Sequence, residues 1–219
     1  MCLEAIKKNG KALKYVPEKH KDYNLCLEAA KNDGHALEYI PERHRTEEIC
    51  NFAIQNSKKI LNFIPVEYRY YLAIKNDIFD FRYVPEEFKD RKVCFEALKI
   101  QGTNLQYVPE KYLDIDMCKM AIKQDGLALE FIPSDLYSED FCQMAVQQNG
   151  LALSFVAGKY ITKETYQVAV KSNGLSLKLI PKNSRDKEIC LLAIEQNGTA
   201  LQYVPDKHKD YNMCFKAIE

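Results

Sequence analysis

Eight cysteines are the residues of this chain with the widest chemical range, because a thiolate can bind zinc, act as a nucleophile or form a disulfide. None belongs to a C-x-x-C pair, and the four histidines do not alternate with them at the spacing of zinc ligands. Each cysteine instead stands three residues before an alanine, at Cys2, Cys26, Cys50, Cys94, Cys118, Cys142, Cys190 and Cys214. We therefore predict small, buried, reduced side chains with no metal and no cofactor.

Other catalytic patterns are absent from the sequence. The glycines are spaced by whole repeats, so there is no G-x-G-x-x-G and no G-x-x-x-x-G-K phosphate loop. Three histidines share one position after a proline that Tyr, Phe or Leu fills elsewhere, namely His20, His44 and His208. A position that accepts such different side chains is typical of packing, so we predict no catalytic residues and no enzyme.

A column of lysines could bind an anionic ligand. It lies two residues after the alanine in six units, at Lys7, Lys31, Lys75, Lys99, Lys123 and Lys171. The other full units have Gln55, Gln147 and Glu195 there. One interpretation is a basic ridge for a nucleic-acid backbone or an acidic peptide. The other is a set of cations that complement the dipole at the end of a helix. Because Lys plus Arg and Asp plus Glu both number 31, nucleic acid is possible but not favoured.

A second position varies from unit to unit within a constant apolar framework. It holds Lys14, Glu38, Asn62, Arg82, Gln106, Glu130, Ser154, Lys178 and Gln202. Such variation is expected of a recognition surface and equally of an unconstrained solvent position. The candidate ligand surface therefore comprises the six lysines together with Arg82 and Glu130.

These positions repeat because the whole chain repeats. The central alanines are Ala5, Ala29, Ala53, Ala73, Ala97, Ala121, Ala145, Ala169, Ala193 and Ala217. Their spacing is 24, 24, 20 and then 24 six times. A fixed period of this length indicates a stacked array. We predict an all-α fold, an α-solenoid of about nine 24-residue units of short helix-turn-helix repeats.

The sequence of each unit predicts the same order of helices and turns. A capping Asp, Ser or Thr opens a helix of about ten residues, seven positions before the alanine. Asn or Asp followed by Gly ends it, and we expect that glycine to adopt the left-handed conformation. A second apolar segment stops at a proline, and we predict it to be a short helix, since a lone strand would lack ladder partners.

The units are expected to form one array over residues 1–219. Their boundaries are 1–24, 25–48, 49–68, 69–92, 93–116, 117–140, 141–164, 165–188, 189–212 and a partial 213–219. Unit 49–68 lacks four residues after Pro65, including the helix cap, while Lys58 and Ile78 replace the glycine. Ala157 stands where other units have proline. Each departure is either a functional kink or drift, and both ends suggest an excerpt of a larger protein.

The run A-[IV]-x-x-[ND]-G-x-x-L-x-[YF]-[VI]-P, seen from Ala121 to Pro133, resembles the repeat of the family called domain of unknown function 4116. The resemblance covers essentially the whole chain. It implies a helical repeat region, often within larger microbial proteins, without an assigned activity and without catalytic residues to transfer.

These observations favour a non-enzymatic, cytoplasmic scaffold that binds an unknown protein partner. No stretch approaches the roughly 20 apolar residues of a membrane span, so no membrane is expected. Two alternatives stay open. The lysine ridge could bind nucleic acid or another acidic ligand, or the repeats could be the targeting arm of an enzyme whose catalytic domain lies outside this chain.

Overall fold

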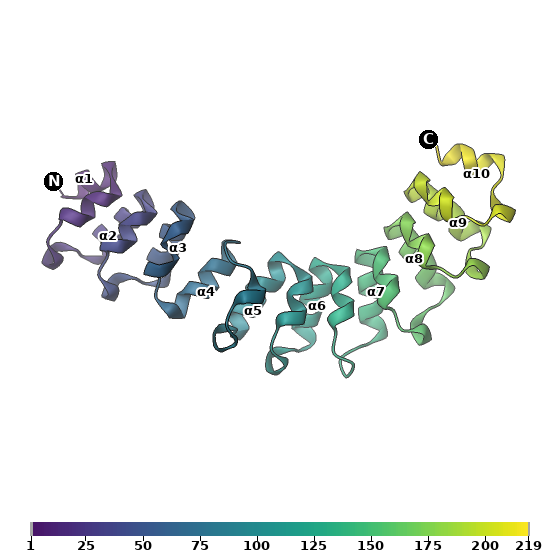
Figure 1. Ribbon diagram of the computed structural model, residues 1–219, viewed down its shortest axis with the longest axis horizontal. Coiled ribbons are helices and arrows are strands. Elements are labelled where there is room, and N and C mark those ends of the chain that lie inside the picture. The colour runs from purple at the N-terminus through teal and green to yellow at the C-terminus, as the bar shows by residue number, and fades with distance from the viewer. Residues whose placement is uncertain (1, 219) are drawn as a thin grey trace. The chain divides into compact units, whose positions relative to one another are not determined.

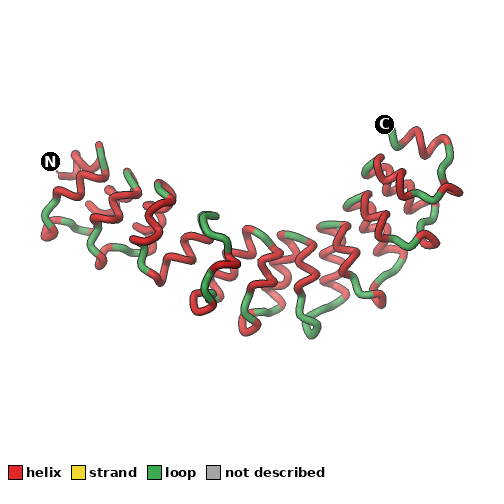
Figure 2. Tube along the Cα trace, viewed as in Figure 1, coloured by secondary structure: helices red, strands yellow, loops and turns green. Residues whose placement is uncertain are grey.

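The computed structural model describes residues 2–218, which contain helices and turns and no β-strand. Each regular repeat consists of an α-helix, a second helix of the 3-10 type and, after the proline, a three-residue 3-10 turn. Figure 2 shows this alternation of helix and loop along the chain. The predicted all-α repeat fold is confirmed, as is the choice of a helix over a strand for the second segment.

The first helices of the repeats carry the alanines and cysteines. They are α1 (Cys2–Lys8), α2 (Tyr23–Asn32), α3 (Glu47–Asn56), α4 (Val66–Lys75), α5 (Arg91–Ile100), α6 (Ile115–Gln124), α7 (Glu139–Gln148), α8 (Lys163–Ser172), α9 (Lys187–Gln196) and α10 (Tyr211–Lys216).

The second helices carry the leucine and aromatic positions. They are η1 (Gly10–Tyr15), η3 (Gly34–Tyr39), η5 (Lys58–Phe63), η6 (Phe81–Tyr83), η8 (Gly102–Tyr107), η10 (Gly126–Phe131), η11 (Gly150–Phe155), η13 (Gly174–Leu179) and η15 (Gly198–Tyr203). The short turns that follow are η2 (Glu18–His20), η4 (Glu42–His44), η7 (Glu86–Phe88), η9 (Glu110–Tyr112), η12 (Gly158–Tyr160), η14 (Lys182–Ser184) and η16 (Asp206–His208). Each begins after a proline except η12, which begins after Ala157.

The chain divides into two compact units, residues 1–97 and 98–219, with the boundary inside α5. In the first unit α1, α2 and α3 pack side by side, and in the second α6 to α9 do so (Figure 1). Their second helices pack on one another in the same order. That the repeats form one continuous array stays a prediction.

The predicted helix caps are confirmed. Asp22 Oδ1 accepts a hydrogen bond of 2.8 Å from Leu25 N, which satisfies a free N–H group of the first turn of α2. The same bond is made by Thr46, Asp90, Asp114, Ser138, Thr162, Asp186 and Asp210.

The prediction of left-handed glycines is wrong, since no glycine of the described residues has a positive φ. The glycine is required for another reason. Gly150 begins η11 and faces the next repeat, where a Cβ atom would lie closer than 3.0 Å to the carbonyl oxygen of Ala169. The Asn or Asp before it caps the second helix, as Asn149 Oδ1 does for Leu151 N at 3.0 Å. Glycine therefore permits close packing between repeats.

In several repeats a polar side chain three residues after the alanine joins the repeat to the preceding one. Gln124 Oε1 accepts from Gly102 N at 2.6 Å, and its Nε2 donates to Ile100 O at 2.8 Å. Both backbone groups lie at the end of the preceding α-helix or the start of its second helix. The same pair of bonds joins Gln148 to Gly126 and Gln124, and Asn32 to Gly10 and Lys7. This amide clamp satisfies backbone groups that the glycine contact removes from water.

A second inter-repeat contact comes from the residue four positions after the proline. Arg45 Nη1 donates to Phe63 O at 3.2 Å, and Arg185 Nη1 donates to Tyr203 O at 2.7 Å. Lys21 makes the equivalent bond to Tyr39 O at 2.9 Å. Its side chain is buried, and its charge is paired with Glu18 at 2.6 Å. Each contact supplies a partner to a carbonyl near the end of a second helix.

The short unit departs from this pattern in the way its sequence predicts. α4 begins directly after Pro65, without a turn of the η2 type and without a side-chain cap. It ends at Lys75, and two residues later Asp77 has a φ of 51°, the one positive value among the non-glycine residues that the structure describes. Lys58, in the place of glycine, is exposed.

The helices on either side of α4 are connected across it. Lys92 Nζ on α5 lies 2.9 Å from Glu47 Oε2 on α3 and 3.7 Å from the centre of the Tyr71 ring on α4. All three residues belong to the first compact unit. A cation paired with a carboxylate and placed over an aromatic ring links three consecutive repeats where the turn is missing.

Candidate binding surface

The predicted ligand residues are all exposed but lie on two kinds of helix. Each of the six lysines stands in the last turn of its α-helix. There a cation interacts favourably with the helix dipole. Lys31 is also 3.8 Å from Glu28 and lies over the Phe52 ring at 5.1 Å. Contacts of this kind explain a lysine without any ligand.

Arg82 and Glu130 lie on second helices, at the variable position. Arg82 is 3.1 Å from Asp80 and 5.6 Å from the centre of the Tyr83 ring, so it contacts residues close to it in the chain. Glu130 on η10 is exposed and lies at the edge of a groove. The lysines and these two residues thus do not share one structural position.

The groove near Glu130 is the feature that the sequence pattern only partly anticipated. It has a volume of about 450 Å³ and runs over η8, η10, η11 and η13 of the second unit. Four variable positions are brought together there, which are Gln106, Glu130, Ser154 and Lys178. The remaining lining residues are Thr103, Leu127, Phe131, Leu151, Phe155 and Leu179. Its apolar members recur every 24 residues, and that period is the signal by which they could have been found.

The polar groups of the groove differ in how well they are satisfied. Gln106 Nε2 donates to Thr103 O at 3.1 Å, and Ser154 Oγ donates to Leu151 O at 2.9 Å. The side-chain charges of Glu130 and Lys178 have no ion pair or hydrogen bond with any residue between 2 and 218. These two charges are available to a ligand.

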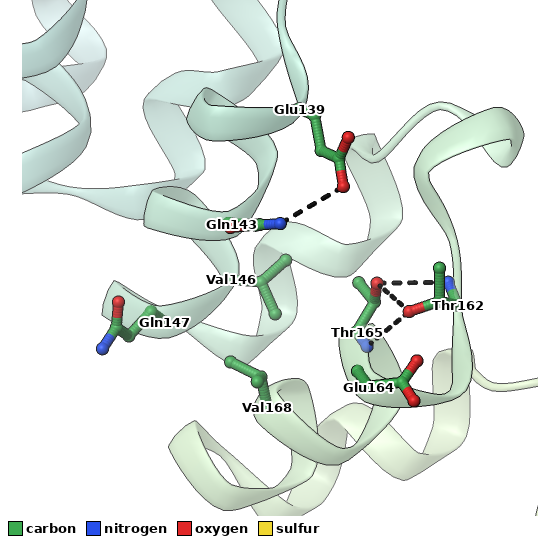
Figure 3. Close-up of a pocket in the computed structure, with 8 residues that line it drawn as sticks. All are labelled: Glu139, Gln143, Val146, Gln147, Thr162, Glu164, Thr165 and Val168. Atoms are coloured by element: carbon green, nitrogen blue, oxygen red, sulfur yellow. Dashed lines mark hydrogen bonds between the residues drawn. The ribbon is translucent and has the colours of Figure 1, made fainter.

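A separate pocket of about 350 Å³ lies between α7 and α8. Val146 and Val168 face each other across it, while Glu139 and Gln143 stand at one side (Figure 3). The cause is Thr165, which occupies the position where the other first helices of this unit carry a buried Met, Phe or Ile, such as Phe141. A smaller, polar residue leaves the space between the helices unfilled.

The polar groups beside this pocket satisfy one another. Thr162 Oγ1 accepts from Thr165 N at 3.2 Å, and Thr165 Oγ1 accepts from Thr162 N at 3.1 Å, which forms a capping box (Figure 3). Thr165 Oγ1 also donates to Tyr160 O at 3.1 Å. The carboxylate of Glu139 accepts from Gln143 Nε2 at 3.3 Å. The pocket is therefore explained by local structure.

The cysteines form part of the interior. Cys26, Cys50, Cys94, Cys118, Cys142 and Cys190 are buried free thiols, whereas Cys2 is exposed and Cys214 is partly exposed. Burial raises the pKa of Cys50 and Cys94 to about 12 and that of Cys26, Cys118 and Cys190 to about 11. The predicted role as small buried side chains is confirmed for these six. A thiol with so high a pKa carries almost no nucleophilic thiolate at neutral pH.

Two other classes of site were sought in the described chain. Among residues 2–218, no three His, Cys, Asp or Glu side chains gather where they could hold a metal ion. Over that same range no helix has the length and apolar character needed to cross a bilayer.

The family comparison agrees with the repeat geometry. The family model described as Domain of unknown function (DUF4116) matches residues 1–45, 22–69, 70–113, 90–137, 114–161 and 186–219. Residues 162–185, which contain Thr165 and α8, lie outside these matches. No curated protein and no solved structure matches the chain.

Proposed function

Because the chain belongs to the family described as Domain of unknown function (DUF4116), which assigns no reaction, we propose from its surface that it is a non-enzymatic protein-binding array. The observation that carries this proposal is the groove over η8 to η13. It combines half-buried Leu and Phe side chains with two unpaired charges. Such a combination of apolar area and a few placed polar groups suits recognition of another chain.

The location that we propose is the cytoplasm. Six buried cysteines remain free thiols, and none of them needs to be oxidised for the repeats to pack. A reducing compartment keeps such thiols in this form. The proposed partner is accordingly another cytoplasmic protein.

Site-specific crosslinking in the source cell tests the proposal. A photo-reactive benzophenone side chain is placed at Ser154, inside the groove, and in a separate variant at Glu188, which is exposed on α9. We expect a discrete protein adduct from position 154 that forms at low and high salt and survives nuclease. Position 188 is the matched control and should give no such adduct.

The rival hypothesis predicts another result. If the lysine column binds nucleic acid, the same reagent at Lys123, whose side chain is exposed, should yield an adduct that nuclease removes and that high salt prevents. The absence of a protein adduct at position 154 would overturn the protein-binding proposal, and a nuclease-sensitive adduct at position 123 would then support the rival hypothesis.

A further inference from the structure

We propose that the groove over η8, η10, η11 and η13 binds an extended, proline-containing peptide segment in the polyproline II conformation, with a basic and an acidic residue six positions apart. This inference rests on the proposed protein-binding function and gives the partner a chemistry. The observations that support it are the period of the repeats, the apolar lining of the groove and the two unpaired charges.

The period of the groove matches the pitch of this conformation. Adjacent packed helices are about 8–10 Å apart, so equivalent positions of neighbouring second helices recur at about that distance. A polyproline II helix has three residues per turn and rises about 3.1 Å per residue, which gives about 9.3 Å per turn. Each turn of the peptide therefore meets the same position of the next repeat. A β-strand repeats its side-chain direction every two residues, or about 6.6–6.8 Å, and would fall out of phase.

The lining of the groove has the character that such a peptide requires. Phe131 and Phe155 come from the same position of successive repeats, and Leu127 and Leu151 from another. All four side chains are half-buried, so they are held by their own repeats and still present a face to solvent. Grooves lined by aromatic side chains are the usual docking sites of proline-rich segments, which lose little conformational entropy on binding.

The two unpaired charges define the ends of the segment. Glu130 lies on η10 and Lys178 on η13, two repeats further along. Two repeats correspond to two turns of the peptide, or about six residues. A lysine or arginine of the peptide would pair with Glu130, and an aspartate or glutamate six positions away would pair with Lys178.

The same charges disfavour a nucleic acid in this groove. One carboxylate and one ammonium group give the lining no net positive charge, whereas a backbone of phosphates requires an excess of cations. The aromatic residues alone could stack on bases, but Glu130 would face the phosphates. A zwitterionic peptide complements the groove, and a polyanion does not.

A peptide library provides the direct test. Random peptides of about twelve residues, enough for four turns of three residues, are displayed on phage and selected on the full 219-residue chain. We expect enrichment of prolines between one basic and one acidic residue six positions apart, in a single order along the peptide. The selection is repeated with the double variant Glu130→Lys and Lys178→Glu, which should select the opposite order of charges.

A matched control reverses another pair of charges in the same unit. Glu195 and Lys216 form an ion pair of 2.5 Å between α9 and α10, so the double variant Glu195→Lys and Lys216→Glu keeps a pair while moving the charges. This variant should select the same peptides as the wild-type chain. With a selected peptide in solution, each single reversal at Glu130 or Lys178 should weaken binding about fivefold, since an exposed pair is lost.

The outcomes separate this inference from the function on which it rests. Reversal of the selected charge order in the groove variant alone supports the inference. Peptides without the six-residue spacing, an unchanged order or no enrichment would overturn it, while a protein adduct from position 154 would still support protein binding. Absence of that adduct contradicts protein binding itself.

Discussion

Tyr137 and Ala157 both depart from the repeat pattern, and a hydrogen bond joins them. The backbone N–H of Ala157 donates to Tyr137 Oη at 3.1 Å, and the same hydroxyl donates to Phe155 O at 2.6 Å. In the other regular repeats a proline stands at the position of Ala157, and proline has no N–H group to donate. The Tyr137 hydroxyl can both donate and accept. The Lys or Arg that several other repeats have at the position of Tyr137 can only donate. The missing proline thus has a structural explanation.

Replacing Tyr137 by phenylalanine should lower the free energy of unfolding by about 1–2 kcal/mol, because the Phe155 carbonyl and the Ala157 N–H both lose their partner. Ala157→Pro is compatible with the backbone, since φ is −62° there. The change in the free energy of unfolding caused by Ala157→Pro should be about 1 kcal/mol more favourable in the Tyr137→Phe background than in the wild-type chain. In that background the proline removes an N–H group that has lost its acceptor. Chemical denaturation of the four proteins measures this coupling. Additive effects would contradict the explanation.

Gly150 and Gly158 offer a matched pair within one repeat. Gly150→Ala should cost about 1–3 kcal/mol, because the new methyl group would overlap the carbonyl of Ala169. Gly158→Ala meets no atom within 4 Å and should stabilise the chain by about 0.4–1 kcal/mol by restricting the unfolded state. Thermal and urea unfolding of both variants check the prediction. Equal effects would show that the contact with Ala169 does not select glycine at position 150.

Ser176 is a position where substitution should stabilise the protein. Its side chain is fully buried, and its hydroxyl has no hydrogen-bond partner within the part of the chain that the structure describes. Five other repeats have alanine at this position, for example Ala152. Ser176→Ala should raise the free energy of unfolding by about 1 kcal/mol. Ser154→Ala, on the exposed groove, serves as the control and should change it by less than about 0.5 kcal/mol.

The buried thiols predict how stability depends on pH. Their pKa is raised by burial from an ordinary value of 9.0 to about 12 for Cys50 and Cys94. The folded state therefore retains thiol protons that the unfolded state loses as the pH rises above 9. The contribution of these thiols to the free energy of unfolding is complete below pH 9 and is lost as the pH rises towards 12. We expect the free energy of unfolding to fall from about pH 9 upwards, and to fall less steeply in a Cys50→Ala, Cys94→Ala variant. Parallel slopes for the two proteins would contradict the assignment.

The same burial predicts which thiols react. At neutral pH a disulfide reagent should modify Cys2 and Cys214 rapidly in the native 219-residue chain and the six buried cysteines only after unfolding. The double variant Cys2→Ser, Cys214→Ser should lose the rapid phase. A rapid phase that persists in this variant would show that the interior opens readily.

The regular features of the fold could be predicted from the sequence because they depend on residues within one repeat. The caps at Asp22 and its equivalents, and the buried face that carries Ala53 and Cys50, follow from local spacing. The role of glycine could not be predicted in this way, because Gly150 is constrained by Ala169 of the next repeat, a contact absent from any single unit.

The groove over η8 to η13 could be predicted only in part for a similar reason. The variable position indicated Glu130 as a candidate, but the same reasoning grouped it with lysines that lie on other helices. Which side chains share one groove depends on how η10 packs on η11 and η13. The link between Tyr137 and Ala157 also joins two repeats, and a local pattern cannot reveal it.

The amide clamp has an evolutionary consequence. Gln124 and Gln148 make the same bonds to their preceding repeats, so excision of residues 117–140 would bring Gly102 opposite Gln148 instead of Gln124. Both junctions use a glycine N–H and a glutamine oxygen at 2.6 Å. Duplication or loss of a whole unit by recombination would therefore create a junction that is already compatible. The length of the peptide segment that we propose could then change by three residues at a time without a new interface having to evolve.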